Sequence, residues 1–182
     1  MEKAAKTFVS ALVVLLAVVL ACPVAASDDF KIGIGGGATF LSGDYSKVYN
    51  TGWTGTVRAM WVPSWFILGI RGAGYYGQNS PSDSLGGAIK ASTLYGADAN
   101  AVLRLIGTGA NGLYLNGGFG FRSLQTKVSL AGGEQSTTTS QVCYNGGAGF
   151  STGWFFAEAN VVYFSVSGTN FLSYPVTVGV QF

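Results

Sequence analysis

The chain has 182 residues and a formal net charge of +2, with 10% charged residues, 14% aromatic residues, 28 glycines and no histidine. A net charge this small does not indicate the basic surface that binds nucleic acid. Without histidine, the chain lacks the usual general base of hydrolytic enzymes. After the first 26 residues, no apolar run is long enough to form a spanning helix. An apolar chain of this kind is typical of a transmembrane β-barrel, in which half of each strand faces lipid.

The first 26 residues have the pattern of a secretory signal peptide. Lys3 and Lys6 precede an apolar run over residues 8–21, and Val24 and Ala26 stand where signal peptidase requires small residues. We therefore predict a signal peptide over 1–26 and an outer-membrane barrel domain over 27–182. An uncleaved anchor helix is the less favoured alternative, because the apolar run is short.

The two cysteines allow one further processing route. Cys22 lies in the stretch "VLAC", which loosely matches a lipoprotein box, but Leu20 occupies a position that usually holds a smaller residue. Lipidation of Cys22 stays open as a minor alternative. Once the signal peptide is removed, Cys143 has no partner for an internal disulfide, and we expect it to be a small buried side chain.

Alternation of apolar and small or polar residues begins at Phe30 and predicts four strands in the first half of the chain. These strands cover residues 30–41, 53–61, 65–76 and 93–105. In the last of them Tyr95, Ala97 and Ala99 fall on the apolar face, opposite Asp98 and Asn100.

The second half repeats the pattern over residues 113–122, 142–150, 155–164 and 174–182. In the last segment Val176, Val178 and Val180 alternate with Thr177 and Gly179, so one face is continuously apolar. The total is eight strands, an even number as single-chain outer-membrane barrels require. The predicted fold is all-β, an eight-stranded antiparallel up-and-down transmembrane barrel.

The connections between these strands alternate between long and short. Long polar breaks over 42–52, 77–92, 125–140 and 166–171 alternate with short ones at 62–64, 106–112 and 151–154. Outer-membrane barrels have long extracellular loops and short periplasmic turns. This alternation predicts that both chain ends lie on the periplasmic side.

Aromatic residues gather toward the two ends of the predicted strands, as expected for the interfaces of a bilayer. Three of the four tryptophans flank the short turns, and tyrosines, including Tyr75, lie toward the long loops. The residues that we assign to the interfaces are Trp61, Trp65, Tyr76, Tyr95, Tyr144, Trp154, Phe155 and Tyr163.

Charged residues fall on the inner faces of the strands, where they predict a polar network with a positive excess. An interior of eight strands is only wide enough for side chains to fill, and breaking a buried ion pair costs about 3 to 5 kcal/mol. We therefore predict that Asp98 pairs with Arg71 or Arg122, and that Glu158 pairs with Arg58 or Arg71. The predicted lumen network comprises Lys31, Arg58, Arg71, Asp98, Arg104, Arg122 and Glu158.

The pattern resembles that of the small eight-stranded outer-membrane barrels of the OmpA/OmpX-like family, over about Phe30 to Phe182. Its most specific part is the ending "VTVGVQF", which is similar to the strand signal read by the outer-membrane assembly machinery: Tyr174, Val176, Val178, Val180 and Phe182. Glu158 is similar to the inward carboxylate of many such barrels. Because the chain stops at the barrel, we expect that the peptidoglycan-binding domain appended in some members is absent.

The resemblance implies a structural or surface-interaction protein in the outer membrane of a Gram-negative-type bacterium. Its expected partners are outer-membrane lipid and the assembly machinery, and we expect a monomer without a cofactor or a metal. Barrel enzymes of this architecture depend on a histidine, so we predict no enzyme. The glycine run 33–38 precedes no helix, which argues against a dinucleotide site.

Two other functions remain open on the sequence. One is a narrow pore or a conduit for small solutes or hydrophobic molecules, as in OmpW-like barrels. The other is a soluble eight-stranded binder of the lipocalin or streptavidin type, which would carry its apolar face inside. That arrangement would leave arginine and glutamate scattered over a glycine-rich exterior.

Overall fold

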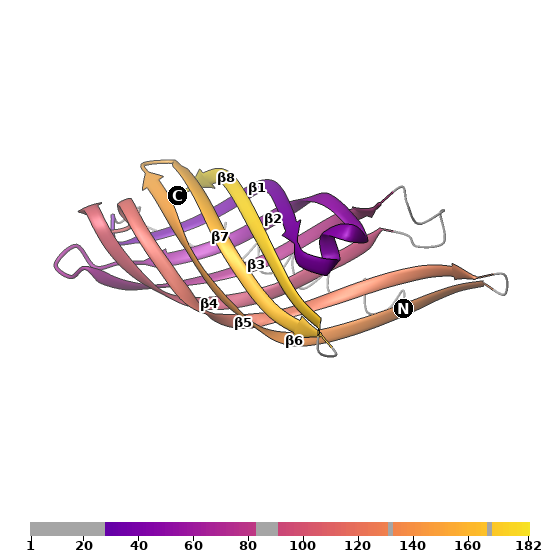
Figure 1. Ribbon diagram of the computed structural model, residues 1–182. Helices are drawn as coiled ribbons and strands as arrows, with labels where there is room; N and C mark the ends of the chain where they lie inside the picture. Colours follow the sequence, from indigo (N-terminus) through magenta and orange to yellow (C-terminus); the bar gives the residue numbers. More distant parts are fainter. Residues whose placement is uncertain (1–27, 83–90, 131–132, 167–168) are drawn as a thin grey trace.

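A computed structural model describes residues 28–82, 91–130, 133–166 and 169–182. Within these ranges the chain forms one closed antiparallel barrel in the order β1-β2-β3-β4-β5-β6-β7-β8 (Figure 1). The strands are β1 (Phe30–Ser42), β2 (Tyr49–Trp61), β3 (Leu68–Pro81), β4 (Ser92–Thr108), β5 (Asn111–Leu130), β6 (Gly133–Thr152), β7 (Phe155–Val166) and β8 (Thr169–Gln181), and a 3-10 helix, η1 (Gly43–Lys47), follows β1. The predicted signal peptide and Cys22 lie outside the described residues.

The barrel closes through the pairing of the first strand with the last. Ile34 pairs with Val180 and Phe40 with Tyr174, while each remaining strand pairs with its neighbour in sequence. Within the closed part of the barrel, the backbone amides and carbonyls on both edges of each strand therefore face a neighbouring strand. The fold class predicted from the alternation is confirmed.

Side chains alternate between a buried inner face and an exposed apolar outer face. On β6, Phe150, Tyr144 and Val142 are exposed apolar residues, and toward the tip they give way to exposed Ser140 and Thr138. The stretch from Val142 to Phe150 matches the roughly 9 to 11 residues that a tilted strand needs to cross a bilayer. An exposed band of this height is the surface that a transmembrane barrel presents to lipid. No helix in the described ranges is both long and apolar enough to cross a membrane.

We call the end of the barrel with the connections 62–67, 109–110 and 153–154 the turn end, and the opposite end the loop end. Several strands reach further toward the loop end than the alternation predicted. β2 begins at Tyr49 and β3 continues to Pro81, so less of the chain is left for loops. At the turn end, residues 65–67 precede β3 instead of starting it, and Trp65 stacks on Phe66 with ring centroids 5.5 Å apart.

The largest departure is the predicted loop over 125–140. Residues in this region pair as two strands, from Gln125 with Thr138 to Leu130 with Gly133. We call the paired residues 126–130 and 133–139 the β5–β6 ribbon. In Figure 1 this orange ribbon extends beyond the other strands at the loop end. Ser, Thr and Gly suggested a loop, but threonine is also a good strand former when both faces of a hairpin are solvated.

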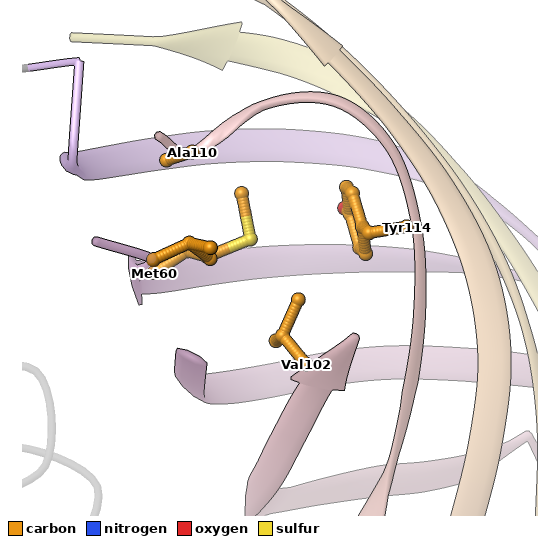
Figure 2. Packing of buried hydrophobic residues seen from close by; sticks show 5 residues of the cluster. Met60, Val102, Ala110 and Tyr114 are labelled. Atoms are coloured by element: carbon orange, nitrogen blue, oxygen red, sulfur yellow. The ribbon is translucent and has the colours of Figure 1, made fainter. Parts of the chain in front are cut away.

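Two apolar clusters occupy the lumen in addition to polar residues. At the turn end, Met60, Val102, Ala110 and Tyr114 converge from β2, β4, the 109–110 turn and β5, together with Val62 (Figure 2). Toward the loop end, Cys143, Val162, Phe164 and Phe171 form the second cluster, with Leu94 packed against it. The ion-paired residues lie between the clusters, whereas Lys31 and Arg104 lie toward the turn end, so the lumen is not polar throughout.

Candidate functional site

Glu158 on β7 is the centre of a buried ion-pair cluster that crosses the lumen. Its two carboxylate oxygens accept from different strands: Oε1 from Nη1 of Arg58 on β2, and Oε2 from Nη2 of Arg71 on β3 at 2.6 Å. The side chains of all three residues are fully buried. The sequence predicted a pair with one of these arginines, and the structure places Glu158 between both.

Asp98 on β4 extends the cluster toward the loop end. Its Oδ1 lies 3.3 Å from Nη1 of Arg71 and accepts from Nδ2 of Asn100 at 3.0 Å. Its Oδ2 lies 3.4 Å from Nη2 of Arg122, whose guanidinium stands over the Tyr75 ring at 4.3 Å. Asp98 thus contacts both of the arginines that the sequence proposed as alternatives.

Neutral side chains complete the cluster, and the sequence analysis did not assign them to it. The Tyr114 hydroxyl accepts from Arg58 and donates to Glu158, and Gln181 Oε1 accepts from Nη2 of Arg58 at 2.6 Å. The sequence does indicate that Tyr114 points into the lumen, because it alternates with the outward residues Leu113 and Leu115. The alternation does not predict which inward residues meet across the lumen.

Tyr75 corrects the predicted band of interface tyrosines. It points into the lumen, where its hydroxyl accepts from Nη2 of Arg71 at 2.6 Å. Adjacent residues of a strand face opposite sides, so Tyr75 and the outward Tyr76 cannot both lie against lipid. Tyr76 instead packs against Trp53, with ring centroids 5.7 Å apart.

Two predicted members of the network lie apart from the ion pairs. Arg104 is only partly buried and donates to backbone carbonyls at the turn end, to Pro63 at 3.2 Å and Gly109 at 3.0 Å. Lys31 is buried, but none of the ion pairs among the described residues includes it. Lys31 and Arg104 were assigned to the network because they lie on the inner face of their strands. They lie at a different depth along the barrel from the ion pairs.

The chain entering β1 covers the turn end. The Asp28 carbonyl accepts from the amide of Ala110, and the Asp29 carbonyl accepts from the amide of Val62 at 2.8 Å. The Asp28 carboxylate accepts from Asn111 Nδ2 at 3.0 Å, which ties the same segment to β5. These bonds join two turns to the start of β1, directly below the apolar cluster around Met60.

A small cavity lies toward the loop end among the described residues. Its volume is about 10 Å³, and its apolar lining includes Leu41, Leu94, Leu124, Phe164 and Phe171. A space of this size holds about one water molecule. The cavity is therefore too small for a solute larger than a water molecule.

Six of the eight aromatic residues assigned to the membrane interfaces are exposed or partly exposed on the outer face of the strands, and Trp65 and Trp154 are exposed in connections at the turn end. Trp154 and Phe155 meet edge to face at the turn end, with ring centroids 6.0 Å apart. Amphipathic rings suit the boundary between lipid and water. The set comprises Trp61, Trp65, Tyr76, Tyr95, Tyr144, Trp154, Phe155 and Tyr163.

The final strand presents its apolar row outward. The exposed residues of this row are Tyr174, Val176, Val178, Val180 and Phe182, and the alternate residues Thr177 and Gln181 are buried in the lumen. The Phe182 amide donates to the Ile32 carbonyl at 2.8 Å, so the last residue still belongs to the β1–β8 seam.

Cross-strand hydrogen bonds join polar side chains of β5 and β6 where the two strands lead into the β5–β6 ribbon. The hydroxyls of Ser123 and Ser140 lie 2.7 Å apart, and Gln125 Nε2 donates to the Ser136 hydroxyl at 3.0 Å. No group of three potential metal ligands occurs in the described part of the chain. The described groups at the loop end include backbone, hydroxyl and amide groups that can hydrogen-bond, together with the Lys127 ammonium on β5.

Solved structures of outer-membrane proteins share the barrel fold. Ail, the attachment invasion locus protein of Yersinia pestis, superposes with a TM-score of 0.65 at 18% identity, covering 85% of this chain and 98% of Ail. The chain has the fold of the small eight-stranded outer-membrane β-barrels. The N-terminal barrel of Pseudomonas aeruginosa OprF matches with a TM-score of 0.58 at 15% identity, covering 84% of this chain and 97% of that domain. No protein-family model and no curated protein sequence matches this small barrel.

Proposed function

We propose that this protein is a non-catalytic barrel of the outer membrane that makes contacts at the cell surface through the β5–β6 ribbon. The observation that carries the proposal is the position of the ribbon: its polar strands continue past the apolar band that ends near Val142. The loop end then faces the outside, and both chain ends lie in the periplasm. An exposed polar ribbon above a lumen filled by side chains suits binding better than transport.

The closed interior supports contact over conduction. Glu158 bridges arginines of two strands, and apolar clusters lie on either side of the charged band. An open pathway would require at least two buried ion pairs to separate, at about 3 to 5 kcal/mol for each broken pair. The absence of histidine from the sequence and the full pairing of Glu158 likewise disfavour acid-base catalysis.

Surface labelling on intact cells tests the orientation. Ser136→Cys places a thiol on the ribbon, and Ser64→Cys places one at the exposed turn end. We expect a membrane-impermeant maleimide to label the ribbon variant on intact cells, and the turn-end variant only after the outer membrane is permeabilised. The opposite pattern of labelling contradicts the proposed orientation.

A shortened ribbon tests the surface contact itself. Replacing residues 126–137 by Asn-Gly joins Gln125 to Thr138, which already face each other across the hairpin. Asn-Gly favours the two-residue turn that such a pair requires. We expect cells that carry the shortened barrel to lose adhesion to other cells and to protein-coated surfaces, at an unchanged amount of barrel. Equal adhesion by both proteins contradicts the proposal.

A further inference from the structure

β6 has a free edge along the ribbon. Its pairing with β7 reaches Cys143, opposite Phe164, and β7 then turns back by pairing Val166 with Thr169 of β8. Residues 135–142 of β6 pair with β5 on one side, and no described strand pairs with their other side. A row of backbone amides and carbonyls on such an edge is a template for another strand.

This edge lacks the features that usually prevent strand addition. Natural edges are protected by lysine, proline or bulges. From Gln135 to Val142 the strand has no charged residue and no proline, and its pairing with β5 contains no register shift. Its side chains are exposed or half-buried hydroxyls and amides, with Val142 at the membrane boundary.

The sequence of the edge is a palindrome. Residues 135–141 are "QSTTTSQ", which reads identically in both directions about Thr138. If a second copy of β6 pairs antiparallel about a two-fold axis at Thr138, Ser136 meets Ser140 of the second copy and Gln135 meets Gln141. Each cross-strand pair then joins like side chains that hydrogen-bond well, including Thr with Thr. A two-fold contact needs a self-complementary patch, and this strand has one.

The direction of the strands decides where the second copy is anchored. β6 runs from the ribbon tip toward its barrel, and an antiparallel second copy runs the opposite way. The two barrels therefore lie at opposite ends of the paired ribbons. The ribbons of two barrels in one membrane point in the same direction, so their β6 strands would be parallel. In a parallel pair the palindrome cannot match residues about a two-fold axis at Thr138.

We propose that the free edge of β6 binds the same edge of a second copy anchored in a facing membrane, forming a continuous four-stranded sheet between two cells. The proposal rests on the proposed surface function and names its partner. The barrel remains a monomer within its own membrane, and the ligand is the chain itself.

Charge variants at the two-fold axis provide the main test. Thr138 faces itself across the axis, so Thr138→Lys and Thr138→Glu each bring like charges together, which is destabilising for directly opposed residues. We expect nanodiscs with one wild-type barrel each to form pairs of doubled mass. Either variant alone should lower the paired fraction about tenfold, and mixing the two should restore it. Thr126→Lys and Thr126→Glu, on β5, are the matched controls and should leave pairing unchanged.

Crosslinking gives the geometry of the pair. We expect Thr138→Cys barrels to form a disulfide-linked dimer and Thr126→Cys barrels to stay monomeric; Cys143 is buried in the lumen. Electron micrographs should show linked nanodiscs face to face. Unpaired wild-type discs, pairing by Thr138→Lys alone, or linked discs that lie edge to edge would each overturn the proposal. If discs stay unpaired while the shortened ribbon still abolishes adhesion, the homotypic contact is wrong and the surface function stands.

Discussion

The Phe156 ring occupies a hollow in the lumen wall formed by three glycines. A Cβ atom added at Gly33, Gly35 or Gly179 would lie 2.9, 2.7 or 2.6 Å from the ring, and the Arg58 guanidinium covers the other face at 3.7 Å from the ring centroid. The glycine-rich inner faces of β1 and β8 therefore fit a specific side chain from β7. Glycine positions facing lipid have no such neighbour.

Substitution at Gly33 tests this fit. We expect Gly33→Ala to destabilise the barrel by about 1 to 3 kcal/mol, the range for overpacking, and the penalty to shrink when Phe156→Leu is also present. The measurement is denaturant unfolding in lipid vesicles, analysed as a double-mutant cycle. Gly36→Ala is the control: its added Cβ would meet no atom closer than 3.6 Å, so we expect a change within about 0.5 kcal/mol. Equal penalties at Gly33 with and without Phe156 contradict the fit.

Glu158 is the residue on which the ion-pair cluster depends most. Because Glu158→Gln leaves Arg58 and Arg71 without their shared carboxylate, we expect it to lower the free energy of unfolding by about 3 to 5 kcal/mol. Arg122→Gln should cost less, since Arg122 is 3.4 Å from Asp98 and Asp98 retains Arg71 and Asn100. The same unfolding assay compares the two variants. A larger loss for Arg122→Gln would show that the cluster is centred elsewhere.

Ion pairs could be predicted from the sequence because few opposite charges share the lumen. Asp98 and Glu158 were the inward acids, so their partners had to come from the inward arginines. The places of Tyr114, Gln181 and Phe156 could not be predicted in the same way. Which neutral residues meet across a barrel depends on how far each strand is shifted along its neighbours. The alternation within one strand does not reveal this shift.

At the scale of elements, strand alternation predicted all eight strands and the β1–β8 closure. The alternation did not predict the β5–β6 ribbon, because its described side chains are exposed or half-buried and no buried apolar face marks the strands. The ribbon depends instead on the β-propensity of threonine and on cross-strand bonds such as Gln125 to Ser136. Alternation thus locates strands within the membrane and misses their solvated extensions.

The ribbon should be dispensable for folding. Replacing residues 126–137 by Asn-Gly removes only pairs beyond the closed barrel, and an isolated two-stranded ribbon contributes little stability. We expect the shortened protein to retain its heat-dependent gel shift and to unfold within about 1 kcal/mol of the wild type. Loss of the folded gel band contradicts the division into a stable barrel and an accessory ribbon.

At the scale of the whole molecule, three layers of side chains lie in the lumen: the Met60 cluster with Asp28 and Asp29 at the turn end, the Glu158 cluster, and the Phe164 cluster toward the loop end. The sequence indicated a filled interior from the strand number, but the apolar layers were not expected. Met60, Val102 and Phe164 occupy inward positions of their strands. They were not recognised as a lumen layer because the neighbouring residues that face lipid are apolar as well.

Conductance separates a sealed barrel that acts at the surface from a narrow pore. The most direct measurement is a planar-bilayer recording of the purified wild-type protein, with Glu158→Gln as the variant that weakens the central layer. We expect no steady conductance from the wild type, because an ion would have to displace buried, paired charges and two apolar clusters. Steady, ion-selective conductance from the wild-type protein would contradict the sealed lumen and favour transport as the function.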